Sequence, residues 1–357
     1  MLRFKETPTV VELQSSHSVA TDFAHGVASK GHATQGLKAV RLSAETELSQ
    51  AVTDATHIFL SPEAMLESKW IDIFRQQLFR QSLCAVFVDE AHCIVQWGTG
   101  SAPFRVAYAM LGHIRSFTKP GTPMVAMTAT ATTTVMNQII QVCGMREVAY
   151  VVESPNRPNI RYSVCSIPSP SYSEVFIWLQ EDLRQKGKEC EKVLVFCRKM
   201  EDCVILYQSF ATSLGDSSYV PAGECTLQNV LFGMFHAKLT KSDKDILLDS
   251  FTKSDGNCRV IFATIAFGIG VNIPDIHTII HIGPSSSVYS YVQESGRAGR
   301  DGQQSHAIIL LYPGALRGNV GKGMKAYCRE PQVCRRITAS TVLSWPLLQA
   351  PTTAQLL

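Results

Sequence analysis

The sequence predicts an α/β protein built on parallel β-sheets, and three observations support that fold class. Short apolar runs recur along the chain, each run is followed by polar or turn residues, and stretches with helical spacing lie between the runs. The apolar character of the runs is continuous and does not alternate, so we expect strands that are covered on both faces, as in a parallel sheet. Parallel strands need long connections, which the helical stretches would provide.

In chain order, the predicted strands and helices alternate. The apolar runs predict strands over His57–Ser61, Ala85–Glu90, Met124–Thr130, Ala149–Glu153, Val193–Cys197, Val260–Thr264, Ile279–Gly283 and Ala307–Tyr312. Helical crossovers are clearest over Lys199–Ser213 and Ser242–Phe251. In a sheet of this kind, functional side chains gather just past the carboxyl ends of the strands.

The chain length of 357 residues suits two domains of ordinary size. The stretch Ser154–Ser173 is rich in Pro, Ser and Asn, which is typical of a connection between domains. We therefore predict a boundary near residue 155, with one domain over 1–153 and a second over 154–313. After Pro313 the sequence is rich in Gly, Lys and Arg, so 314–357 is a separate segment.

The composition excludes several classes of protein. Hydrophobic residues make up 45% of the chain and charged residues 18%, which excludes intrinsic disorder. The formal net charge of +3 is too small to indicate binding to nucleic acid or to a membrane. The 11 cysteines show no C-x-x-C spacing, which favours a reducing compartment. No secretory signal or membrane span is evident, so we expect a soluble intracellular protein.

An acidic motif, Asp89-Glu90-Ala91-His92, closes the second of these apolar runs. Two adjacent carboxylates after a buried strand lose hydration, and this cost is justified where they serve a metal ion or a proton transfer. In phosphoryl transfer Asp89 would hold Mg²⁺ through water and Glu90 would polarise the attacking water. The alternative is a helix start with acidic residues in its first turn.

A second motif, Gln293–Gly302, contains two arginines, Arg297 and Arg300. On a helix, residues three apart project from one side, and Arg is suited to bidentate contact with a phosphate. The alternative is a solvated basic turn on the surface.

These motifs together resemble a RecQ-like superfamily-two DNA helicase. The segments that carry the resemblance occur in the family's order and approximate spacing: Asp89–Gly98 (DEAHCIVQWG), Met127–Thr132 (MTATAT), Ser154–Val164 (SPNRPNIRYSV), Phe262–Ile276 (FATIAFGIGVNIPDI) and Tyr291–Gly302 (YVQESGRAGRDG). Ile58–Glu63 resembles the family's motif Ib, and Val193–Cys203 resembles the start of motif IV. The resemblance covers residues 36 to 336.

The resemblance implies the fold and the activity. It implies two tandem RecA-like domains, a truncated first domain over 1–153 and a second over 154–313, followed by a remnant of a helical zinc subdomain over 314–357. The implied activity is ATP-dependent 3′-to-5′ unwinding of duplex DNA in replication, recombination and repair in the nucleus. ATP and Mg²⁺ would be the cofactors, and single-stranded DNA and duplex junctions the partners.

The resemblance also implies roles for individual residues. The implied catalytic residues are Asp89, Glu90, His92, Arg297 and Arg300, with His92 and Thr128–Thr130 linking the nucleotide state to DNA contact. The implied nucleotide-binding residues are Asp89, Gln293, Arg297, Arg300, Gly268 and Gly270. The implied DNA-binding residues are Gln96, Trp97, Phe104, Arg105, Thr128, Thr130 and Thr264, since aromatic rings stack on bases and Arg holds phosphates. For Trp97 the alternative is a half-buried packing residue.

The sequence departs from the family at the phosphate loop. The motif G-x-x-x-x-G-K-[ST] does not occur in the chain, and Gly318–Gly323 has the wrong spacing for it. The residues before His57 are too few for the expected first strand, phosphate loop, helix and motif Ia strand. We therefore expect little ATP turnover from this chain alone, and the alternative function is a RecQ-like fragment that binds DNA without turnover.

Three further departures are local. Thr99–Pro103 replaces the family's His-Asp, and Asn272 stands where the family commonly has Asp. Cys328 and Cys334 resemble the opening of the zinc subdomain, but no cysteine follows Cys334, so the chain cannot complete a four-ligand zinc site. A third hypothesis, a hydrolase unrelated to nucleic acid, leaves the arginine and aromatic segments unexplained.

Overall fold

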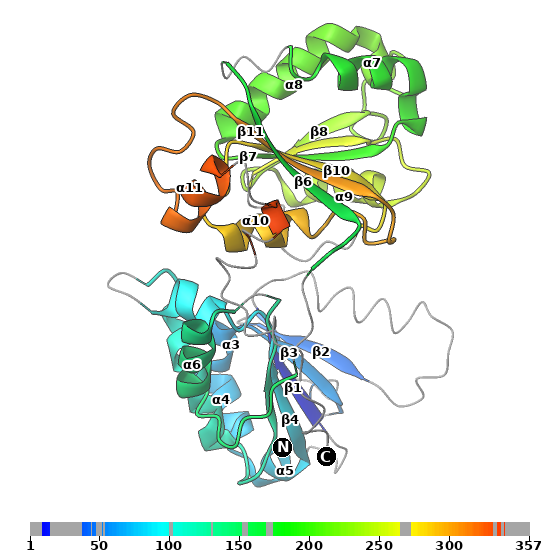
Figure 1. Ribbon diagram of the computed structural model, residues 1–357. Helices are drawn as coiled ribbons and strands as arrows, with labels where there is room; N and C mark the ends of the chain where they lie inside the picture. The colour runs from blue at the N-terminus through cyan, green and yellow to red at the C-terminus, as the bar shows by residue number, and fades with distance from the viewer. Residues whose placement is uncertain are drawn as a thin grey trace. The chain divides into compact units, whose positions relative to one another are not determined.

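The computed structural model describes residues 9–14, 38–43, 45–47, 52, 54–99, 103–129, 131–151, 156–168, 174–264, 273–330, 334–336 and 339. These residues form two compact units, which divide between residues 155 and 156. Each unit is an α/β structure with its own parallel sheet (Figure 1).

The first unit is built on a five-stranded parallel sheet with the order β2-β3-β1-β4-β5. Its strands are β1 (Thr9–Leu13), β2 (Ala39–Leu42), β3 (His57–Leu60), β4 (Leu83–Val88) and β5 (Met124–Ala126). Its helices are α3 (Pro62–Met65), α4 (Ser68–Phe74), α5 (Gln77–Ser82), the π-helical turn η1 (Ile94–Gly98), the 3₁₀ helix η2 (Val106–Phe117) and α6 (Thr133–Val142).

The core of the first unit lies between this sheet and its helices. Val86 and Val88 of β4 are buried, and so are the large side chains Trp70 and Tyr108 of the helices. Side chains also fix where helices begin: the hydroxyl of Thr132 accepts a hydrogen bond from the N–H of Val135 at the start of α6. This packing leaves the carboxyl ends of β1, β4 and β5 at one edge of the sheet.

The second unit is built on a six-stranded parallel sheet with the order β6-β11-β10-β7-β9-β8. Its strands are β6 (Ile160–Ser166), β7 (Lys192–Cys197), β8 (Phe232–Phe235), β9 (Val260–Ala263), β10 (Ile276–Ile282) and β11 (Ser305–Leu311). Its helices are α7 (Ile177–Lys186), η3 (Gly187–Glu189), α8 (Met200–Leu214), η4 (Gly215–Ser218), α9 (Lys241–Thr252), α10 (Val288–Ser295) and α11 (Lys322–Arg329).

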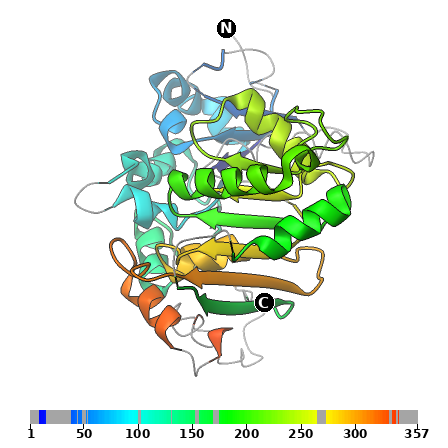
Figure 2. The same ribbon diagram turned by 90° about the horizontal axis from the view of Figure 1, so that it is seen from above.

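The six-stranded sheet is covered on both faces. Every residue of the central strand β7 is buried, as continuous apolar character predicts. Helices α7 and α8 (green) lie along one face, where Phe210 packs against Phe232 and Phe262 (Figure 2). Helices α10 and α11 lie on the other face (Figure 1). The described part of 314–357 therefore packs on the second unit.

The predicted parallel α/β architecture is confirmed, with two differences among the strands. The strand predicted over Ala149–Glu153 is wrong for 149–151, which lie in no strand, because Tyr150 and Val151 are 60% and 96% exposed and have no sheet to pack on. Residues 152 and 153 lie outside the described residues. Conversely, β1 and β2 precede β3, where we expected too little chain for a motif Ia strand.

Candidate functional site

The acidic motif lies at the carboxyl end of β4, between the ends of two neighbouring strands. The N–H of Asp89 donates to the carbonyl of Leu13 at 2.9 Å, and the N–H of Ala91 donates to the carbonyl of Met127 at 2.8 Å. Glu90 has a φ of +47°, which is uncommon for a residue with a Cβ and marks a local strain that the two anchored neighbours maintain. The motif is therefore a bend across the sheet edge and not the first turn of a helix.

The carboxyl groups at this edge are held in a partly desolvated place. Burial raises the pKa of Asp89, although its Oδ1 accepts a hydrogen bond from the N–H of Glu90 at 2.8 Å. Burial also raises the pKa of Glu12 on β1; Gln14 opposes this shift by donating to Glu12 at 2.8 Å, and the negative charge of Asp89 adds to it. Sequence reasoning missed Glu12 because β1 was not among the predicted strands.

Carboxylate oxygens of this kind suit Mg²⁺, which usually keeps several waters and takes one or two carboxylates from the protein. Within the described ranges, no three His, Cys, Asp or Glu side chains converge on a point that could hold a metal ion. Asp89 and Glu90 would therefore serve a hydrated Mg²⁺ whose other ligands come from water and substrate phosphate.

His92 joins the acidic motif to the residues after β5. Its Nδ1 lies 3.0 Å from the hydroxyl of Thr128 and 3.2 Å from Oε2 of Glu90. Burial lowers the pKa of His92 to about 4, so the imidazole is neutral at pH 7 and carries a single N–H. The structure brings Glu90, His92 and Thr128 together, whereas Thr130 lies outside the described residues.

Trp97 is a half-buried ring that packs on the core of the first unit. It lies in the π-helical turn η1, is partly buried against the core, and makes edge contacts with Phe104 at 6.2 Å and Tyr108 at 5.6 Å between ring centroids. Phe104, by contrast, is 79% exposed, and Gln96 is exposed too. Phe104 is therefore the ring that is available to stack on a base.

Arg105 is engaged within the protein. Its guanidinium donates two hydrogen bonds to the carboxylate of Glu63, at 2.7 and 2.6 Å, and lies over the rings of Trp97 and Tyr108. Burial is the largest single influence on the pKa of Glu63 and raises it, but the hydrogen bonds and charge of Arg105, together with hydrogen bonds from the backbone of Glu63 and from Ser61, lower the pKa overall. Contact of Arg105 with a phosphate would compete with this ion pair. Nothing in the sequence signals this role for Glu63 or Tyr108.

The two arginines of the second motif do not share a helix face, and this prediction is wrong. Helix α10 ends at Ser295, whose hydroxyl donates back to the carbonyl of Tyr291, and residues 296–300 form a turn. Arg297 is only 6% exposed, whereas Arg300 is exposed. We call residues 296–302 the arginine turn.

The arginine turn is clamped by the segment that precedes β6. The guanidinium of Arg157 donates to the carbonyls of Gly296, Ala298 and Gly299, at 3.3, 3.3 and 2.7 Å. The amide of Asn159 donates to the carbonyls of Gly299 and Gln303, both at 2.8 Å. Desolvation and then the charge of Arg157 lower the pKa of Arg300. The sequence predicted only a connection over these residues.

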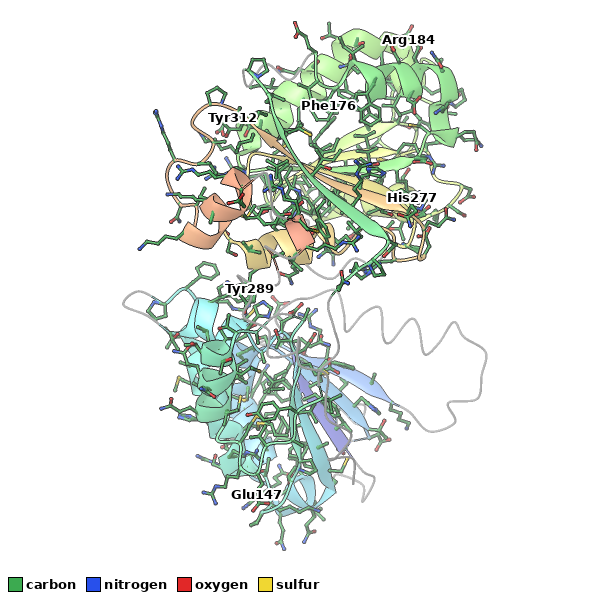
Figure 3. The ribbon with its side chains drawn as sticks, viewed as in Figure 1. Glu147, Phe176, Arg184, His277, Tyr289 and Tyr312 are labelled. Atoms are coloured by element: carbon green, nitrogen blue, oxygen red, sulfur yellow. The ribbon has the colours of Figure 1, made fainter. Side chains whose placement is uncertain are left out.

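Two further contacts tie this turn to its own sheet. His277, labelled in Figure 3, lies at the start of β10 with its Nε2 2.8 Å from Oδ2 of Asp301. At the other end of β10, the buried carboxylate of Glu294 accepts hydrogen bonds from Ser285 at 2.6 Å and from His281 at 3.0 Å. These contacts position α10, on which Gln293 lies half-buried.

The remaining predicted residues are dispersed. Thr264 follows β9, where its N–H donates to the carbonyl of Phe235 at 3.1 Å, and Gly268, Gly270 and Asn272 lie outside the described residues. Burial raises the pKa of the Cys328 thiol to about 11, and Cys334 is exposed. Among the described residues no third His, Cys, Asp or Glu gathers with these two cysteines, so they do not make up the four-ligand zinc site of the family.

The two α/β units, each with its own parallel sheet, have the fold of tandem RecA-like helicase domains. Residues 175–302 match the model of the helicase conserved C-terminal domain. The fold is similar to that of S. cerevisiae Dbp5 bound to RNA and ADP BeF3, with a TM-score of 0.64 and 16% identity over 95% of this chain and 82% of that chain. It is also similar to the helicase MrfA bound to DNA, with a TM-score of 0.62 and 15% identity over 86% of this chain and 43% of that chain.

Sequence comparison then narrows the class to a family. The chain is 31% identical to the RecQ-like DNA helicase BLM of Xenopus laevis over 71% of this chain and 17% of that protein. It is 28% identical to the ATP-dependent DNA helicase RecQ of Haemophilus influenzae over 72% of this chain and 36% of that protein. It is 31% identical to the ATP-dependent DNA helicase Q-like 2 of Arabidopsis thaliana over 74% of this chain and 34% of that protein.

The chain is therefore RecQ-like: it is a homologue of the RecQ-family DNA helicases. It spans about a third or less of the length of these three relatives. In the part of the chain that the structure describes, no helix is both long enough and apolar enough to cross a membrane.

Proposed function

We propose that the chain carries the ATP-dependent, 3′-to-5′ DNA-unwinding function of a RecQ-family helicase and acts in the nucleus in replication, recombination and repair. The observation that carries this proposal is the convergence of Glu90, His92 and Thr128 at the ends of β4 and β5. In such an arrangement the neutral imidazole of His92 links Glu90, which would polarise water, to Thr128, which follows the neighbouring strand β5. Bound Mg²⁺ and ATP would supply the charge and the phosphoryl group.

The chain's own residues would each have a simple task. Asp89 would hold the hydrated Mg²⁺, and Glu90 would accept the proton of the attacking water. Arg300, exposed on a clamped turn, is the more accessible cation for a nucleotide phosphate, and Arg297 would support that turn from within.

The DNA interface would centre on two exposed side chains, Phe104 and Gln96, the latter on η1. Stacking of a base on an aromatic ring contributes about 1–3 kcal/mol and tolerates any sequence. Trp97 and Arg105 would hold Phe104 in position and would not themselves be the first contacts.

A second candidate function is DNA binding without ATP turnover. It is favoured by the absence of G-x-x-x-x-G-K-[ST] from this 357-residue sequence, since that loop supplies the amides and the lysine that hold the β- and γ-phosphates. Both functions share the DNA interface and differ only in hydrolysis.

The experiment that separates them is ATP hydrolysis by the purified chain with Mg²⁺, with and without single-stranded DNA, for the wild type and Glu90→Gln. The helicase function predicts DNA-stimulated turnover that falls at least 100-fold in Glu90→Gln, since the residue that activates water is removed. Turnover that is absent in the wild type, together with retained DNA binding, would favour the second function. Glu67→Gln, at a half-buried position before α4 in the same unit, is the matched control because its side chain makes no capping hydrogen bond and has no role in the site.

A further inference from the structure

Helix α11 presents a row of positive charge on the surface of the second unit. Its apolar residues Met324, Tyr327 and Cys328 are buried, and the helix packs against α10 (Figure 1). The residues at positions one, four and eight of the helix are Lys322, Lys325 and Arg329. Residues with this spacing lie along one helix face. We call these three residues the α11 stripe.

The charged groups of the α11 stripe are not paired with other described residues. Among the described residues, no hydrogen bond or ion pair joins the side chain of Lys322, Lys325 or Arg329 to another group. The helix contains no acidic residue, and the acid that follows it, Glu330, lies beyond the last turn.

The neighbouring arginines behave differently. Arg335 donates to the carbonyl of Tyr327, and Arg336 donates to the carbonyls of Pro158 and Ile160. Those two cations hold the chain together, whereas the α11 stripe has no structural use that the described contacts reveal.

The length of the stripe fits a nucleic-acid backbone. From the first to the last charge is seven residues, which at about 1.5 Å per residue is about 10 Å. Phosphates along one strand of a duplex are spaced by about 3.4 Å of helix axis, so the stripe covers about three of them. A membrane is disfavoured as the partner, because the apolar face of α11 is already buried in the protein.

We propose that the α11 stripe binds the phosphate backbone of duplex DNA, independently of the stacking interface at Phe104. This proposal rests on the proposed function in one respect, which is that the partner is DNA. A helix holds its three charges in a fixed row, which suits the regular phosphates of a duplex, whereas a single strand is held by stacking.

The test is a titration of a fluorescent 20-base-pair duplex with the full chain at 50, 100 and 200 mM salt. The variant is Lys322→Ala with Lys325→Ala and Arg329→Ala. Loss of three phosphate contacts should make the slope of log affinity against log salt less negative by about 2.7, which over this fourfold range of salt is a difference of about 40-fold. Thermal melting should be unchanged, since none of the three side chains makes a hydrogen bond or ion pair with another described residue.

The matched control changes the same net charge elsewhere: Lys241→Ala with Lys244→Ala on α9 and Lys253→Ala at its C-cap, where Lys253 pairs with Asp249. The proposal is overturned if the α11 variant keeps the wild-type slope, or if the α9 control changes the slope equally. It is also overturned if phosphatidylserine vesicles bind the wild type more tightly than the duplex does and lose as much binding in the α11 variant.

Phe104→Ala keeps the two proposals distinct. If it leaves oligothymidine binding intact while the α11 variant changes the duplex slope, the stacking interface fails and the α11 stripe stands. If oligothymidine binding falls in Phe104→Ala and the duplex slope of the α11 variant is unchanged, the α11 stripe fails and the stacking interface stands.

Discussion

The acidic edge of the first unit and the arginine turn of the second are held in place by different chemistry. The acidic edge depends on titratable side chains, with a neutral His92 between Glu90 and Thr128. The arginine turn depends on backbone carbonyls that accept from Arg157 and Asn159, groups that do not change charge near neutral pH. The stability contributed by the acidic edge should therefore depend on pH. The stability contributed by the arginine turn should depend on substitutions that crowd its backbone.

The largest effect should come from the arginine turn. Gly299 has a φ of +55°, and a Cβ there would lie 2.4 Å from Oγ of Ser305 and 2.7 Å from the carbonyl of Gln303. Gly299→Ala should destabilise the second unit by about 3 kcal/mol, because both backbone strain and a clash are introduced. Urea denaturation, followed by far-UV circular dichroism, measures this change.

The control is Gly302→Ala, where φ is +86° but nothing lies within 4 Å of the added Cβ. It should cost only about 1 kcal/mol, the price of the backbone conformation alone. Equal losses in the two variants would mean that the turn is not closely packed.

The clamp on that turn should have the next largest effect. Arg157→Ala removes a guanidinium that satisfies three carbonyls and should cost about 2 kcal/mol, since charged hydrogen bonds to partly buried groups are lost. The comparison is Arg184→Ala on α7 (Figure 3), whose guanidinium donates to Ser213 at an exposed site and should cost less than about 1 kcal/mol. A smaller loss in Arg157→Ala than in Arg184→Ala, measured by the same denaturation, contradicts the clamp.

The acidic edge should instead show a pH effect. The folded imidazole of His92 resists protonation down to a pKa of about 4, whereas an unfolded His takes up its proton near pH 6.5. Between these values the unfolded state binds more protons, so the stability of the first unit falls as pH drops from about 6.5 to 4, by about 2 kcal/mol.

His92→Gln should remove that pH-dependent loss while keeping a group that can bond Thr128. The raised pKa of Asp89 acts in the opposite sense, because a folded carboxyl that holds its proton loses stability as pH rises, and it is present in both proteins. Thermal melts at pH 4.5, 5.5, 6.5 and 7.5 make the comparison. The interpretation of His92 as buried and neutral is wrong if both proteins lose stability in parallel.

The sequence could predict the features that depend on local pattern, but not those that depend on contacts between residues distant in the chain. Continuous apolar runs identified β4, β7 and β10, and the DEAH tetrapeptide located the acidic edge, because both depend on local pattern. The position of Arg300 could not be predicted, since helix α10 ends at a Ser that bonds its own helix and the turn is then set by Arg157, far away in sequence.

The aromatic segment shows the same limit. The sequence predicts that Trp97, Phe104 and Arg105 belong together, and they do contact one another. It does not predict which ring is exposed, because that depends on Glu63 and Tyr108, which lie on α3 and η2 and pair with Arg105. Long-range ion pairs of this kind leave no local signal.

The central claim, that this RecQ-like chain binds single strands through an exposed aromatic ring, is tested most directly by titrating fluorescent oligothymidine against the wild type, Phe104→Ala and Trp97→Ala, with thermal melts alongside. Phe104→Ala should weaken binding about tenfold with an unchanged melt, because one stacked base is lost from an exposed side chain. Trp97→Ala should lower the melting temperature, because that ring packs on the core. Wild-type affinity in Phe104→Ala would contradict the claim.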